Sequence, residues 1–426
     1  MFSLTLARNT LLRSILFLGA SVLLAGPALS EQSELTLDAA VALALAQAPE
    51  MAAQRSAIEM TDALAVSAGR LPDPELRFAL DDVPVTGPDA YSLTRDSFTM
   101  RRFAVTQSFP SAAKRSAEKS LARSVLGVAQ AGLARQRVQI AQSVAQAWVD
   151  RQSAEAALTQ LQELTSQFAL QETLSRAAMV AGRGSAADAL SARAARAAFE
   201  DRVFAASANV QRAAIALSRW LGEAGNAALA AAPNFTELPV AAATLLDHAH
   251  EHAMIAVYDS KIVAAQSDVQ LARAAKRPDW SAELAYGHRT AAFSDMVSLE
   301  FRIGLPLFTK YRQDPQIRAK SAALRLLESE REVELRMHRA DLQSALFDWR
   351  SARLRLTLLE GDRLPVAKSR IDVAFSAYRS GNGPLRSVLD ALADSVELQL
   401  ADLALKAQLG RDWTVLEYQT PAEQAP

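Results

Sequence analysis

The sequence of 426 residues contains no cysteine. This absence excludes thiol catalysis, disulfide bonds, Cys-ligated zinc, iron–sulfur clusters and a lipid anchor on an N-terminal cysteine. Aromatic residues make up only 6% and histidine occurs five times, which limits metal binding and acid–base chemistry. The 46 basic and 47 acidic residues nearly cancel, so no nucleic-acid partner is indicated. A glycine-rich phosphate loop and a Ser/His/Asp arrangement are also lacking. We therefore expect a structural or transport protein without a cofactor, and not an enzyme.

The first 30 residues have the three-part layout of a secretory signal peptide. Arg8 and Arg13 precede a 12-residue apolar run at 15–26, and Ala28-Leu29-Ser30 is a small-x-small cleavage site. The run is shorter than the ~20 residues of a membrane-spanning helix, although a retained signal anchor is the alternative. We predict that residues 1–30 are a signal peptide and that the chain is exported.

The rest of the sequence follows one plan twice. The motif AGRLPD at 68–73 returns as AAKRPD at 274–279, and the glycine turn at 181–185 returns at 380–384. Each half is expected to contain a helix, two strands, a very long helix, a glycine turn and a further helix. We predict a first repeat at 31–223, a connector at 224–240, a second repeat at 241–418 and a C-terminal tail at 419–426.

The expected helices are unusually long and rich in alanine. They cover residues 37–69, 116–180, 185–221 and 241–276, and the second of these gives a rod of roughly 100 Å at ~1.5 Å per residue. Gly361 and Pro365 predict a kink or break in the long helix of the second half. In the last helix, apolar residues recur at intervals of three and four positions, which predicts coiled-coil packing. This seam consists of Leu385, Leu389, Leu392, Val396, Leu400 and Leu403.

Strict alternation of apolar and polar residues predicts strands at 280–287 and 297–305, with a weaker counterpart near residues 76–81. Such strands are typical of the wall of a transmembrane barrel, although a soluble two-sheet core gives the same pattern. Four strands are too few to close a pore, so closure would need several chains. We predict that Glu300 and Arg302 face a lumen and that the lipid-facing set is Leu284, Tyr286, Leu299, Phe301 and Ile303.

The order of these features over residues 35–413 resembles the TolC-type outer-membrane efflux proteins. The resemblance implies a mainly α fold with a membrane β-barrel portion, in which a homotrimer forms a 12-stranded barrel and an α-helical tunnel. It also implies a passive exit duct of a tripartite efflux system in the outer membrane of a Gram-negative bacterium, with a long periplasmic part. The implied partners are outer-membrane lipid, a periplasmic adaptor (membrane fusion) protein and an inner-membrane transporter of the resistance-nodulation-division type.

The stretch AGRLPDPELRFALDDVPVTGPD at 68–89 resembles the heavy-metal branch of this family, so heavy-metal cations or drugs are the expected cargo. One departure is the missing cysteine, which many relatives carry in acylated form after the signal peptide. The alternative interpretation of the whole chain is a soluble periplasmic coiled-coil adaptor or chaperone, in which the strands form a small soluble domain. Such an adaptor is expected to have one helical hairpin, whereas two are predicted here.

The two glycine turns are candidates for a periplasmic tip that docks onto the adaptor and closes the tunnel. Their glycines are Gly182, Gly184, Gly381 and Gly383, and the structural interpretation is that glycine simply ends each helix. The resemblance places gate positions on Asp188, Tyr378 and Asp390. A second acid of the family falls on Ser387 and a gate-side arginine on Gly383, so the salt-bridged lock of the family is incomplete. The alternative is that Asp188 and Asp390 are solvated helix charges.

Three of the five histidines lie in the sequence DHAHEH. On a helix, His248 and His252 would share one face at the i, i+4 spacing that zinc or copper can use. A third strong ligand is not evident, so they are weak candidates and no metal site is predicted. His288 and His338 are expected to be isolated side chains, solvated or at the edge of the core.

Overall fold

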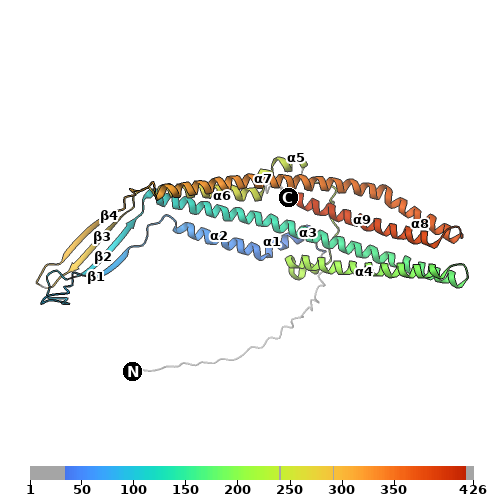
Figure 1. The fold of residues 1–426 in the computed structure, drawn as a ribbon, viewed down its shortest axis with the longest axis horizontal. Coiled ribbons are helices and arrows are strands. Elements are labelled where there is room, and N and C mark those ends of the chain that lie inside the picture. Colours follow the sequence, from blue (N-terminus) through green and yellow to red (C-terminus); the bar gives the residue numbers. More distant parts are fainter. Residues whose placement is uncertain (1–33, 239–240, 291, 419–426) are drawn as a thin grey trace, which may run out of the picture.

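The computed structural model describes residues 34–238, 241–290 and 292–418. It is an elongated molecule with four strands at one end and two turns between helices at the other (Figure 1). The expected signal peptide at 1–30 and tail at 419–426 lie outside the described residues.

The helices follow the same order in both halves of the chain. The first half contains α1 (Leu37–Gln47), α2 (Pro49–Ser67), α3 (Ala112–Val180) and α4 (Ala186–Leu221). The second half contains α5 (Ala242–Asp247), α6 (Ala253–Ala274), α7 (Gln313–Leu358), α8 (Leu364–Arg379) and α9 (Leu385–Glu417). Helix α3 has 69 residues and is about 100 Å long at ~1.5 Å per residue, which confirms the predicted rod.

Two predicted single helices are interrupted. The helix expected at 37–69 is broken at Ala48, because Pro49 lacks the N–H that would continue α1 and instead begins α2. The prediction of a single helix at 241–276 is also wrong. Helix α5 ends at Asp247, a short 3₁₀ turn η2 (Ala249–Glu251) follows, and His252 has an extended backbone before α6. The predicted irregularity near Gly361 and Pro365 is confirmed as a π turn, η3 (Leu359–Arg363), between α7 and α8.

Non-helical segments beside the long helices are held by buried tryptophans. Trp148 of α3 donates its indole N–H to the carbonyl oxygen of Leu35 at 2.9 Å. Trp349 of α7 makes the equivalent bond to Phe235 at 2.9 Å, and hydrophobic clusters surround both sites. The seam predicted for α9 is also confirmed, since its leucines and Val396 are buried or half-buried. The segments that contain Leu35 and Phe235 are therefore packed against α3 and α7.

The strands form one antiparallel sheet in the order β1 (Glu75–Asp81), β2 (Met100–Phe109), β3 (Trp280–His288) and β4 (Met296–Ile303). The two halves meet where β2 pairs with β3, from Arg101 opposite His288 to Phe109 opposite Trp280. Strands β1 and β4 form the two edges. In the described part of the chain, none of the helices has the length and apolar character needed to cross a membrane.

Candidate functional site

One face of the sheet is apolar and uncovered. Its central row crosses all four strands as Leu76, Val105, Leu284 and Leu299, each side chain lying opposite the next. All four are exposed, Leu299 to 63%. The predicted set of Leu284, Tyr286, Leu299, Phe301 and Ile303 does share this face. An apolar surface of this extent normally contacts another protein or a membrane.

Aromatic pairs bracket the central row on the same face. Phe78 and Phe103 pack edge to face, with ring centroids 5.1 Å apart, toward the hairpin ends of β1 and β2. Phe109 and Trp280 stack at 4.1 Å next to the helices. Aromatic side chains are enriched at both interfaces of membrane-spanning barrels.

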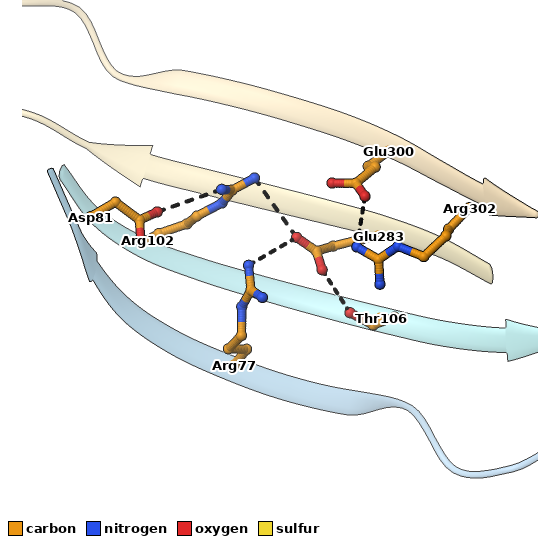
Figure 2. Close-up of polar contacts among 7 residues, drawn as sticks. All are labelled: Arg77, Asp81, Arg102, Thr106, Glu283, Glu300 and Arg302. Atoms are coloured by element: carbon orange, nitrogen blue, oxygen red, sulfur yellow. Dashed lines mark hydrogen bonds and ion pairs between the residues drawn. The ribbon is translucent and has the colours of Figure 1, made fainter. Parts of the chain in front are cut away.

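The opposite face of the sheet is polar, and its centre is Glu283 (Figure 2). This glutamate of β3 is only 6% exposed. Its Oε1 lies 3.4 Å from Nη2 of Arg77 on β1 and 3.7 Å from Nη2 of Arg102 on β2. Its Oε2 accepts a hydrogen bond of 3.0 Å from Thr106. One buried carboxylate thus joins three strands from both halves of the chain.

Two further ion pairs extend the polar face along the sheet. Arg102 reaches Asp81 of β1 at 3.5 Å, and Arg302 pairs with Glu300 on β4 at 2.7 Å (Figure 2). Glu300 and Arg302 therefore lie on the face opposite Leu299, as predicted. The network around Glu283 was not predicted, because alternation assigns a residue to a face but does not give the register that brings Arg77 near Glu283.

The two turns at the far end of the molecule have the same backbone geometry. Gly182 and Gly381 have φ values of 68° and 77°, in the left-handed region that favours glycine. The N–H of the next residue bonds back to the helix in both turns, at 2.9 Å to Ala178 and at 2.9 Å to Ala377. These are Schellman turns, so the glycines are explained by helix termination.

The second glycine of each turn, Gly184 or Gly383, lies close to the preceding helix and leaves little room for a side chain. A Cβ at Gly184 would lie 3.2 Å from the Cβ of Ala178, and one at Gly383 would lie 3.0 Å from the Cβ of Ala377. Both contacts are tight, so a larger residue would push the turn away from the preceding helix. Docking of a partner at these turns stays a prediction.

The predicted gate residues have different surroundings. Asp188 accepts a 2.7 Å hydrogen bond from the hydroxyl of Ser185 and completes a capping box at the start of α4. Asp390 is exposed, and its nearest cation is Arg386 at 3.7 Å, one turn earlier on α9. Tyr378 is half-buried against the cluster formed by α3, α4, α8 and α9. Arg386 was missed by the sequence interpretation, although the i, i+4 spacing from Asp390 indicates it.

The histidines are arranged differently from the expectation. His248 ends α5 and His252 begins α6, so they do not share a helix face. His252 is buried and its Nδ1 lies 2.5 Å from Nε2 of the buried His338 on α7. The expectation of an isolated, solvated or core-edge His338 is therefore wrong. His288 is exposed but bonds to Asp295 at 2.9 Å. Over residues 34–238, 241–290 and 292–418, no group of three or more His, Asp and Glu could hold a metal ion.

Burial controls the charge of the histidine pair. Burial and, to a lesser degree, the adjacent His338 lower the pKa of His252 to about 4, while Glu251 opposes the shift. Burial also lowers the pKa of His338, against the opposing fields of Asp341 and Glu334. Both rings are neutral at pH 7, and the pair is a contact between the start of α6 and α7.

Comparisons with known proteins place the fold. No protein-family model and no curated protein sequence matches the chain. Solved structures do match. The outer-membrane channel OprN is 17% identical, with a TM-score of 0.77 over 92% of this chain and 91% of that one. The outer-membrane protein VceC of Vibrio cholerae is 18% identical, with a TM-score of 0.74 over 90% and 95%.

CusC was solved in a study of the conformational changes that accompany its folding and transmembrane channel formation. It is 15% identical, with a TM-score of 0.77 over 92% of this chain and 93% of that one. These likenesses extend over nearly the full length of each protein and include both the sheet and the long helices. The predicted resemblance is confirmed at the level of architecture, and the chain has the fold of the TolC-type outer-membrane channels.

Proposed function

We propose that the chain is the outer-membrane exit duct of a tripartite efflux system. The observation that carries the proposal is the sheet, whose uncovered face is apolar and whose polar face contains the buried, ion-paired Glu283. A soluble sheet hides its apolar face, whereas a barrel wall presents it to lipid and encloses its polar face around water. The apolar row through Leu299 would therefore contact lipid, and Glu300 and Arg302 would face the lumen.

A homotrimer would complete the barrel. Strands β1 and β4 are the edges of the four-stranded sheet, and an unpaired edge favours addition of another strand. If β4 of one chain pairs with β1 of the next, three chains close a 12-stranded barrel without a free edge. Exposed apolar side chains on the helices would support the same contacts between protomers, on α4 at Phe204 and Ile215 and on α7 at Phe347 and Leu354.

The helical end of the molecule would form the periplasmic tunnel. The turns at Gly182 and Gly381 lie at the opposite end from the sheet (Figure 1), where a periplasmic adaptor and an inner-membrane transporter would engage them. In this proposal Asp188, Tyr378 and Asp390 line the closed end, and three Asp390 carboxylates would attract cations to the constriction. Cargo would be heavy-metal cations or drugs, with passage driven by the transporter and no chemistry performed by the duct.

The domain organisation is part of the proposal. Residues 1–30 would be removed on export, the repeats at 31–223 and 241–418 would each supply two strands and one helical hairpin, and 224–240 would connect them. The two hairpins and the open apolar sheet favour this interpretation over a soluble adaptor or chaperone, which was expected to have one hairpin.

Cell fractionation with a measurement of oligomer mass tests the proposal. We expect the chain in the outer-membrane fraction, extractable only with detergent, at three times the protomer mass. The purified protein should also form conducting pores in planar bilayers, and Asp390→Asn should reduce their preference for cations. Recovery of a monomer from the soluble periplasmic fraction would favour the rival adaptor or chaperone.

A further inference from the structure

The chain is nearly neutral as a whole, but the junction between sheet and helices is strongly basic. Residues 67–75, 108–125, 271–281 and 303–325 connect the strands to α2, α3, α6 and α7. They contain thirteen Lys and Arg and five Asp and Glu, a net charge of +8 in a chain of net charge −1. A concentration of one charge near one end of the long helices needs a physical reason.

Ion pairs within the chain account for few of these cations. Lys114 pairs with Asp279 at 3.2 Å, Lys320 with Asp268 at 2.7 Å, and Lys276 with Asp314. Nine other cations of the four segments make no ion pair among the described residues and are exposed: Arg70, Lys119, Arg123, Arg273, Arg277, Lys310, Arg312, Arg318 and Arg325. Unpaired and exposed, they are available to a partner of negative charge.

Apolar side chains are interleaved with the cations after β4. The segment at 305–312 reads LPLFTKYR. Leu307, Phe308 and Tyr311 are exposed to more than 70%, beside Lys310 and Arg312. Aromatic rings mixed with Lys and Arg are typical of the interface between membrane and water. The mixture distinguishes this surface from a purely ionic one, which would suit nucleic acid or an acidic protein.

The position of this segment can be worked out from the sheet. Leu305 lies six residues after Leu299, which is in the central apolar row. At ~3.3 Å per residue and a strand tilt of ~40°, this separation corresponds to a depth of about 15 Å. Half of the apolar band of a barrel is about 12 Å, so residues 305–312 lie at the level of the lipid headgroups.

The end of α6 lies at the same level. The N–H of Gly304 donates to the carbonyl oxygen of Asp279 at 2.9 Å, and Lys276 pairs with Asp314. Arg277 is therefore brought beside the segment at 305–312. The connections before β3 and after β4 therefore lie side by side in the basic junction.

We propose that residues 305–312, with Arg277, bind the phosphate headgroups of anionic phospholipids in the leaflet that faces the helices. The inference rests on the proposed function, since it takes the apolar face as the lipid-facing one. Phe308 and Tyr311 enter the acyl boundary, while Lys310 and Arg312 contact phosphate. Such contacts fix the depth at which the barrel sits and prevent the long helices from sliding along the membrane normal.

Spin-labelled lipids provide the test. The detergent-purified full chain is reconstituted into phosphatidylcholine vesicles, and the association of labelled phosphatidylglycerol is measured relative to labelled phosphatidylcholine. The test variant is K310Q/R312Q. The matched control is R363Q/K368Q, which removes two exposed cations, without ion pairs in the described part of the chain, from η3 and α8, far from the junction.

We expect the wild-type chain to prefer phosphatidylglycerol. The preference should fall about 5-fold for each cation removed in K310Q/R312Q, should be unchanged in R363Q/K368Q, and should weaken at high salt. Equal association of both lipids with the wild type, or an undiminished preference in K310Q/R312Q, would overturn the inference. Failure of the wild type to insert into pure phosphatidylcholine vesicles would instead contradict the proposed function, so the two failures are distinguishable.

Discussion

If the apolar face of the sheet contacts lipid, the cost of placing a charge at Leu299 can be estimated. This residue is in the middle of β4, opposite Leu284, whereas Ile303 is at the helix end of the strand, opposite Trp280. Four residues at ~3.3 Å and a tilt of ~40° separate the two by about 10 Å of depth. A cation at the bilayer midplane costs about 2–4 kcal/mol, and one near the interface about 0–1 kcal/mol. Leu299→Arg should therefore destabilise the folded chain far more than Ile303→Arg.

The assay is urea-dependent folding into phospholipid vesicles, followed by tryptophan fluorescence and by protection from protease. Ser298→Arg is the matched control, because Ser298 has the same depth as Leu299 but lies on the polar face. We expect it to cost less than about 1 kcal/mol, since the arginine would point into water. If Ser298→Arg and Leu299→Arg have equal costs, or if Ile303→Arg is as harmful as Leu299→Arg, the reasoning about face and depth is wrong.

Three further predictions concern other parts of the molecule. Glu283→Gln should destabilise the sheet by about 1–3 kcal/mol in the same assay, because Arg77 and Arg102 lose the negative charge with which they pair, and Glu283→Asp should cost less. Gly182→Ala should speed proteolysis at the tip, since alanine at a φ of 68° is strained by about 1 kcal/mol, whereas Gly127→Ala, in open space within α3, should not. Burial holds the pKa of His252 at about 4, below its unfolded value of ~6.5. Stability should therefore be retained above pH 6.5 and fall by about 2 kcal/mol between pH 7 and pH 5 in urea titrations, a dependence that His252→Gln should reduce.

The strands were predictable because apolar and polar residues alternate along any strand that has one apolar face. In residues 297–303 the alternation assigns each side chain to a face without knowledge of its neighbours. The pairing register between strands cannot be read from the alternation within one strand. Arg77 and Glu283 are separated by 206 residues, and their contact depends on β2 pairing with β3 between the two halves. A pattern within one strand therefore predicted the polar face but not the buried carboxylate at its centre.

The helix breaks were harder to predict because alanine-rich sequence continues a helical pattern through them. Pro49 was the available signal, since proline is favoured at the first position of a helix and interrupts the one before it. No such signal marks residues 248–252, where the break allows His252 to turn inward and contact His338 on α7. Tertiary packing decides this region, so the i, i+4 histidine spacing was misleading.

The two helical hairpins share a turn geometry but differ in how firmly their helices are fixed. Helix α3 runs without interruption into its turn, and α4 begins with the capping box of Ser185 and Asp188. In the second hairpin a π turn separates α7 from α8, and the N-cap residue of α9 is Pro384, which makes no side-chain capping hydrogen bond.

A capping box contributes about 1 kcal/mol to the start of a helix, and a π turn removes regular i to i−4 bonds. The second hairpin is therefore the less constrained of the two, and it is the one that carries Tyr378 and Asp390. Protease accessibility should therefore be higher in α8 and at the start of α9 than in the matching parts of α3 and α4.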